Sequence, residues 1–124
     1  MTAPERLFVY GTLRPGDCRW ELLEPYVADE GITDTVKGTL YDTGLDYPAA
    51  DFNGDGLVHG MHFGLTEATR ERALRELDIV EDTVDGLYRR VRLRTSAGFE
   101  VWAYEYGTGL DLTLIPSGDW FARN

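Results

Sequence analysis

The chain has little of the chemistry that cysteine and histidine supply. Its 124 residues include a single cysteine, Cys18, which excludes an internal disulfide. A nucleophilic Cys18 would need His59 or His62 as its base, since these are the only histidines, and we expect an incidental thiol instead. No run approaches the roughly 20 apolar residues that span a bilayer, and the first residues lack a signal peptide's apolar stretch. A cytoplasmic protein is the simplest expectation.

Basic residues are also scarce. Twelve Lys and Arg stand against 22 Asp and Glu, which gives a formal net charge of −10. A charge of this sign argues against nucleic acid and against an anionic membrane surface as partners. The length is that of one ordinary domain, residues 1–124, and 43% hydrophobic residues are enough for a core of its own.

Two patterns imitate metal sites without completing them. Asp51–Gly56 starts like a calcium loop, with oxygen-bearing side chains at positions one, three and five and glycine at six. Position twelve of that loop is His62 instead of a glutamate, so we expect a turn. His59 and His62 are three residues apart on a predicted strand, and side chains at that spacing point to opposite faces. We therefore expect no metal.

Hydrophobic periodicity predicts an α+β fold with five or six short strands and two short helices. Because hairpins join most strands, the sheet should be mostly antiparallel. Few elements are left to cover the strand edges, which favours partial closure into a small β-barrel flanked by the helices. The expected strands are 7–10, 32–41, 57–65, 88–95 and 99–106, with an extended piece at 47–50, and the expected helices are 17–26 and 67–77.

The strand Leu7–Tyr10 runs directly into Gly11 and Thr12, and the chain then turns at Pro15–Gly16. Its apolar run predicts a buried strand. Gly11 permits backbone conformations that other residues avoid, and it lets a ligand approach the main chain. A strand that ends in such a turn can direct several N–H groups at one point, which suits an anion or a carboxylate. An ordinary turn is the alternative.

Residues 77–90 form a second informative segment, in which a predicted helix gives way to an acidic loop before a strand begins at Tyr88. Glu81 follows Leu77, Ile79 and Val80, so its carboxyl group can be drawn against the core. Burial raises a carboxyl pKa from about 4.3 toward neutrality, which suits a general acid and base. The alternative is a surface acid among 22 acidic residues.

Five motifs in order give the chain a family resemblance from Leu7 to Trp120. It resembles the gamma-glutamylcyclotransferase-like family, nearest to the short bacterial and plant AIG2-like members, which include gamma-glutamylamine cyclotransferases. The motifs are Tyr10-Gly11-Thr12-Leu13-Arg14, Leu77-Asp78-x-x-Glu81, Tyr88-Arg89-Arg90, Trp102-x-Tyr104 and Ile115-Pro116-Ser117-Gly118-Asp119-Trp120.

The resemblance implies roles for particular residues. The turn Tyr10–Leu13 would hold a gamma-glutamyl group, largely through backbone amides, and Glu81 would be the catalytic residue. Tyr88 would lie near the pocket, and Pro48, in Tyr47-Pro48-Ala49, would line it. The family often has an aromatic residue before the Glu and Gly after it, whereas this chain has Val80 and Asp82. That departure leaves the leaving group of the substrate open.

The reaction implied by the resemblance is intramolecular aminolysis, by an enzyme classed as an acyltransferase or a lyase. The α-amino group of a gamma-glutamyl compound attacks its own side-chain carbonyl and releases 5-oxoproline and an amine or amino acid. The turn would hold the substrate carboxylate or stabilise the developing oxyanion. No cofactor is implied, because nucleophile and electrophile share one molecule. A binding or regulatory module without catalysis is the alternative on the same fold.

Overall fold

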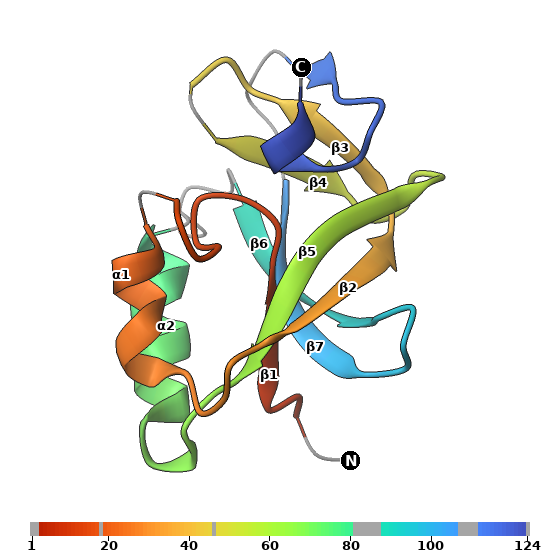
Figure 1. Ribbon diagram of the computed structural model, residues 1–124. Helices are drawn as coiled ribbons and strands as arrows, with labels where there is room; N and C mark the ends of the chain where they lie inside the picture. The colour runs from red at the N-terminus through yellow and green to blue at the C-terminus, as the bar shows by residue number, and fades with distance from the viewer. Residues whose placement is uncertain (1–2, 18, 46, 81–87, 107–111, 124) are drawn as a thin grey trace.

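The computed structural model in Figure 1 describes residues 3–17, 19–45, 47–80, 88–106 and 112–123. It has an α+β fold with a five-stranded and a three-stranded sheet. The strands are β1 (Arg6–Val9), β2 (Ile32–Lys37), β3 (Thr39–Asp42), β4 (Pro48–Asp51), β5 (Leu57–Gly64), β6 (Tyr88–Arg94), β7 (Glu100–Tyr106) and β8 (Thr113–Leu114). The helices are α1 (Trp20–Leu23) and α2 (Arg70–Val80), with the 3-10 helices η1 (Glu24–Tyr26), η2 (Glu67–Thr69) and η3 (Trp120–Ala122).

The larger sheet has the strand order β2-β5-β1-β7-β6, and its strands pair antiparallel except for β1 with β7. In that parallel pair Leu7 lies opposite Trp102, so the carboxyl ends of both strands lie at the same end of the sheet. Strand β6 runs antiparallel to β7, with Tyr88 opposite Tyr106, so the first residue of β6 lies at that same end of the sheet. The topology brings the end of β1 and the start of β6 together.

The expected partial closure into a barrel is not confirmed, because the larger sheet is open and its outer strands β2 and β6 form no ladder in the described part of the chain. The sheet curls until the β6–β7 turn reaches β2, where the Ser96 N–H donates to the Thr35 carbonyl at 2.8 Å. The predicted strand 32–41 breaks at Gly38, where a Cβ atom would lie 3.0 Å from the Asp51 carbonyl oxygen. Beyond that break β3 pairs with β4 and β8 in a second sheet.

Strand β1 is buried on both faces, as its unbroken apolar run predicts. Leu7 and Val9 pack in one hydrophobic cluster with residues of α1 and α2, the two helices that lie side by side in Figure 1. Phe8 and Tyr10 face the other way, into a cluster that includes Trp120 near the C-terminus. Residues directly after β1 are therefore held by core packing from both sides.

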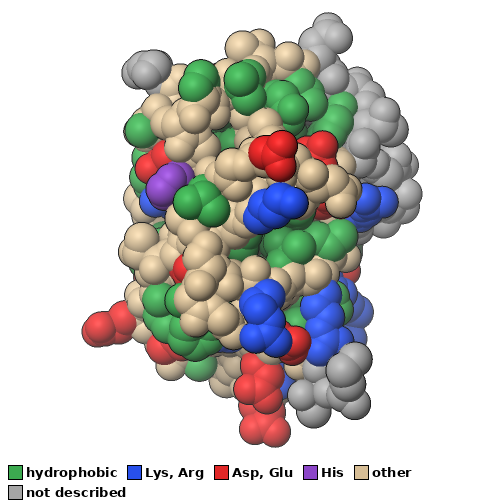
Figure 2. Space-filling model, turned by 90° about the vertical axis from the view of Figure 1, so that its right-hand side faces the viewer, with side chains coloured by type: hydrophobic (Ala, Val, Ile, Leu, Met, Phe, Trp, Pro, Cys, Tyr) green, Lys and Arg blue, Asp and Glu red, His purple; other side chains and the backbone are tan. Residues whose placement is uncertain are grey.

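The predicted helix at 67–77 starts later and ends later than expected. Residues Glu67–Thr69 form the 3-10 turn η2, the α-helix runs from Arg70 to Val80, and Thr66 makes no side-chain cap. No helix in the described ranges is long and apolar enough to cross a membrane. The face in Figure 2 carries Lys and Arg side chains next to Asp and Glu, with hydrophobic side chains between them.

Candidate functional site

A cavity lies at the carboxyl end of β1, between the larger sheet and β4. It encloses about 340 Å³ of empty space, counting the open solvent at its mouth. Six residues that the sequence nominates for substrate binding come together here, although they belong to three separate segments. The lining consists of Phe8, Val9, Tyr10, Gly11, Thr12, Leu13, Tyr47, Pro48, Tyr88 and Tyr104.

The turn after β1 offers backbone donors to this cavity. The Arg14 N–H closes the turn by donating to the Gly11 carbonyl at 3.0 Å, and the Arg19 N–H donates to the Thr12 carbonyl at 2.8 Å. The N–H groups of Gly11, Thr12 and Leu13 themselves donate to no acceptor in the described part of the chain. All three residues are buried, and buried N–H groups without an acceptor are rare in native proteins. The turn can therefore bind an anionic or carbonyl oxygen.

Gly11 is required for a different reason from the one its flexibility suggests. Its φ lies outside the left-handed region in which glycine is favoured. A Cβ atom at Gly11 would instead lie 2.5 Å from Cγ and 2.6 Å from Cδ of Pro48. Pro48 begins β4, so the absence of a side chain lets the second sheet close against the turn.

Three of the four tyrosines at the cavity donate their hydroxyl protons to acceptors within the protein. Tyr88 donates to the Pro48 carbonyl at 2.6 Å, and Tyr10 donates to the Tyr104 carbonyl. Tyr104 in turn donates to Asp78 at 2.8 Å. Their rings line the cavity, and the donors that stay available to a ligand there include the backbone N–H groups of the turn.

Asp78, at the end of α2, connects that helix to the cavity wall. Its carboxylate accepts from the Tyr104 hydroxyl at 2.8 Å and from Nε of Arg90 at 2.8 Å. The Arg90 guanidinium also lies 4.4 Å from the centre of the Trp102 ring. Residues of the second, third and fourth motifs thus contact one another. The sequence did not identify Asp78 or Tyr104 as site residues, although both lie within motifs that it marked.

Glu81, the expected catalytic residue, lies outside the described residues, as do Asp82 and Cys18. The description stops at Val80, just before Glu81, and resumes at Tyr88. Helix α2 ends at Val80, two residues after Asp78, and β6 begins at Tyr88 in the cavity wall.

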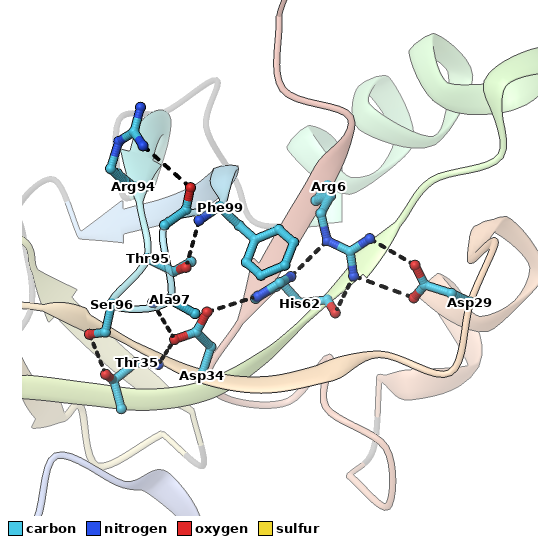
Figure 3. A network of polar contacts seen from close by, with 11 residues as sticks. Arg6, Asp29, Asp34, Thr35, His62, Arg94, Thr95, Ser96, Ala97 and Phe99 are labelled. Atoms are coloured by element: carbon cyan, nitrogen blue, oxygen red, sulfur yellow. Dashed lines mark hydrogen bonds and ion pairs between the residues drawn. The ribbon is translucent and has the colours of Figure 1, made fainter.

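A second polar cluster lies at the opposite end of β1 (Figure 3). His62 is completely buried; its Nδ1 accepts from Nε of Arg6 at 2.7 Å, and its Nε2 lies 3.0 Å from Asp34. Because Nδ1 accepts, the neutral ring donates from Nε2 to Asp34. Burial lowers the pKa of His62 below 6.5, although the hydrogen bond to Asp34 opposes that shift.

The carboxylates of the same cluster are also fully engaged. Burial would raise the pKa of Asp34, but hydrogen bonds from Thr95, the Thr35 N–H and His62 outweigh it and leave the value below 3.8. Asp29 binds Arg6 at 2.8 Å. His59, three residues before His62, is exposed, so the two histidines lie on opposite faces as predicted. In the described ranges no three His, Cys, Asp or Glu side chains gather as a metal site.

Known proteins resemble this chain over most of its length. A model of the family described as gamma-glutamyl cyclotransferase, AIG2-like, matches residues 7–122. A protein of Halalkalibacterium halodurans, provisionally named a gamma-glutamylcyclotransferase, is 38% identical over 93 residues, which cover 68% of this chain and 79% of that protein.

Two solved structures share the fold. One is an uncharacterised protein of Pyrococcus horikoshii, which has a TM-score of 0.72 and 24% identity over 93% of this chain and 88% of its own. The other is the solution structure of YtfP from Escherichia coli, with a TM-score of 0.58 and 36% identity over 95% of this chain and 97% of that one.

Proposed function

The chain belongs to the gamma-glutamyl cyclotransferase, AIG2-like family, and from that premise we propose that it releases 5-oxoproline from a gamma-glutamyl compound. The α-amino nitrogen of the substrate attacks its own γ-carbonyl carbon, a five-membered lactam forms, and the bond to the leaving amine breaks. Nucleophile and electrophile belong to one molecule, so the enzyme's main task is to fold that molecule into attack geometry. The chemistry needs no cofactor.

The observation that carries the proposal is a set of three backbone donors at the end of β1 that have no acceptor among the described residues. A gamma-glutamyl group ends in a free α-carboxylate, which is an acceptor that the N–H groups of Gly11, Thr12 and Leu13 can bind together. Backbone donors recognise the carboxylate largely independently of the side chains.

We assign the proton transfers to Glu81. Support comes from the two ends of the segment that contains it. Asp78 precedes Glu81 by three residues and is bonded to Tyr104 of the cavity wall, and Tyr88 at the far end lines the same cavity. The described residues that flank the segment on its two sides therefore both belong to the cavity region.

In this mechanism the Glu81 carboxylate first takes a proton from the substrate ammonium group, which frees the nitrogen lone pair for attack. The resulting carboxylic acid then gives that proton to the leaving nitrogen. The attacking nitrogen loses a second proton as the lactam forms, and the released amine takes up this proton and departs as an ammonium ion. The residue must be ionised in the first step and protonated in the second, so a pKa near the working pH is favourable. A setting against Leu77 and Val80 would raise the pKa of Glu81 in that direction.

The test is 5-oxoproline release from a panel of donors: gamma-glutamyl amino acids, gamma-glutamylamines and glutathione. Glu81→Gln keeps the size of the side chain and removes its proton chemistry, and we expect a fall in turnover of about 100-fold or more. Asp82→Asn is the matched control one residue away, and it should retain most of the activity. Undiminished turnover in Glu81→Gln would remove Glu81 from the mechanism.

The donor panel also tests the proposal as a whole. Binding of gamma-glutamyl compounds in calorimetry without 5-oxoproline from any of them would favour a non-catalytic binding module. Release from one donor class alone would identify the leaving group.

A further inference from the structure

The C-terminal motif contacts the turn that lines the cavity. Arg14 Nη1 donates to Asp119 at 2.9 Å, and the Arg14 guanidinium lies 3.8 Å from the centre of the Phe121 ring. Trp120, between them, donates from Nε1 to Asp17 at 3.2 Å. Three successive residues, Asp119–Phe121, thus contact the stretch 14–17, and we call them the C-terminal latch.

The latch is itself fixed to the core. Trp120 is 2% exposed and packs in the cluster that contains Phe8 and Tyr10. Just before it, the Gly118 carbonyl accepts from the His59 N–H at 2.8 Å. Gly118 has φ +68°, and a Cβ atom there would lie 1.9 Å from the Leu57 carbonyl oxygen. The C-terminal latch can therefore act as a rigid support for the stretch 14–17.

Arg14 transmits that support to the turn. Its N–H closes the turn on the Gly11 carbonyl at 3.0 Å, and its own carbonyl accepts from the Asp17 N–H at 3.0 Å. Arg14 is absent from the cavity lining, and Asp119 neutralises its charge. These contacts favour a role in positioning over direct binding of substrate.

We propose that Arg14 and Asp119 are positioning residues, which hold the donors of Gly11–Leu13 in the geometry that binds the substrate carboxylate. The inference rests on the proposed function for its substrate. Its physical basis is that donors must be fixed to within about half an ångström to act together. A turn without this support would lose conformational entropy each time substrate bound, and affinity would fall.

Asp119→Asn tests the pair. The Asn side chain can still accept from the Phe121 N–H, as Asp119 does at 3.0 Å, so the start of η3 is preserved while the ion pair is lost. We expect KM for a gamma-glutamyl donor to rise about tenfold, with kcat within about twofold, because ground-state binding is what weakens. Arg14→Lys, which keeps the charge but loses the planar fork and the stacking on Phe121, should raise KM in the same direction.

Arg123→Ala is the matched control. Arg123 lies 3.9 Å from the centre of the Trp120 ring and donates to the Trp120 carbonyl at 2.9 Å, so the change perturbs the same 3-10 helix from outside the turn. KM should stay at the wild-type value. Equal rises in KM for Arg123→Ala and Asp119→Asn would overturn the inference, since general loosening of the C-terminus would then explain both.

Direct binding of substrate by Arg14 predicts the opposite result. Arg14 Nε is buried and has no acceptor in the described part of the chain. If the Arg14 guanidinium bound the substrate carboxylate, Asp119 would compete for the same guanidinium. Asp119→Asn would then remove that competition and lower KM. A lowered or unchanged KM overturns the positioning role.

Amide hydrogen exchange without substrate separates this inference from the proposed function. The N–H groups of Arg14, Asp17 and Arg19 are hydrogen-bonded within the turn region and report on its order. Their exchange should be about tenfold faster in Asp119→Asn than in Arg123→Ala. That difference is expected even if no donor yields 5-oxoproline, and unchanged exchange overturns the latch whatever the activity.

Discussion

Arg6 begins β1 and Gly11 lies just past its end, so two polar regions flank the same buried strand. At the Arg6 end the guanidinium donates to Nδ1 of His62, to the His62 carbonyl and to Asp29. At the Gly11 end three buried N–H groups have no acceptor in the described part of the chain. In the first region the described side chains satisfy one another and stabilise the fold, whereas the second region leaves donors that a ligand could bind.

This difference predicts that variants at the two ends separate stability from activity. Changes at the end with Arg6 and His62 should alter the free energy of unfolding and leave substrate affinity intact. Changes at the Gly11 end should do the reverse, unless they disturb packing.

The largest effect should come from Gly11→Ala. The new methyl group would overlap the Pro48 ring and displace the donors, and we expect kcat/KM to fall about 100-fold. The double variant Gly11→Ala/Pro48→Ala supplies the control, because it removes Cγ and Cδ and leaves the Pro48 Cβ position at 3.9 Å. Recovery of kcat/KM in the double variant confirms the steric reason, and no recovery contradicts it.

His62→Ala should be next, acting on stability. The substitution leaves the buried Asp34 and the half-buried Arg6 without their shared partner, which costs about 2–4 kcal/mol of unfolding free energy. Denaturant melts measure the loss, with His59→Ala at the exposed position as the matched control. A KM that changes with His62→Ala below the unfolding transition would show that the two ends are coupled.

Stability should also depend on pH through His62. The folded-state pKa lies below the unfolded value of 6.5, so the unfolded chain binds the proton more tightly. The contribution is complete above pH 6.5 and is lost as pH falls toward the folded pKa, by about 1.4 kcal/mol per pH unit. His62→Gln, which cannot titrate, should flatten unfolding free energy across that window. An equally steep profile in His62→Gln would assign the dependence elsewhere.

The smallest effect should come from Thr12→Ala. If the backbone of the turn binds the carboxylate, loss of the Thr12 hydroxyl changes kcat/KM by no more than about twofold. Steady-state kinetics with the best donor of the panel measure it. A fall of about tenfold or more would mean that the side chain, and not only the N–H group, contacts the substrate.

Much of the local structure can be predicted from the residues. The continuous apolar run identifies β1, alternation identifies β6 and β7, and the spacing of His59 and His62 places them on opposite faces. The family resemblance also nominates six residues that line one cavity. Their roles in substrate binding, and the role of Glu81, stay predictions.

Other features could not be obtained from the residues. The periodicity of 32–41 does not show that Gly38 approaches Asp51 and divides the strand between two sheets. Nothing near Gly11 in sequence indicates that its lost Cβ makes room for Pro48. Asp78 reads as an ordinary helix acid until Arg90 and Tyr104 are folded against it.

The sequence by itself determined the buried strand, the glycine turn after it and the family to which the chain belongs, because these depend on residues close together along the chain or on ordered motifs. The tertiary structure decided that the sheet stays open, that β4 closes on the turn and that Arg14 meets Asp119, 105 residues away. Such contacts depend on how the whole chain packs, since no local periodicity encodes which distant surfaces meet. The difference between the Arg6 end of β1, whose polar groups bind one another, and the Gly11 end, whose N–H groups have no acceptor among the described residues, is likewise decided by the tertiary structure.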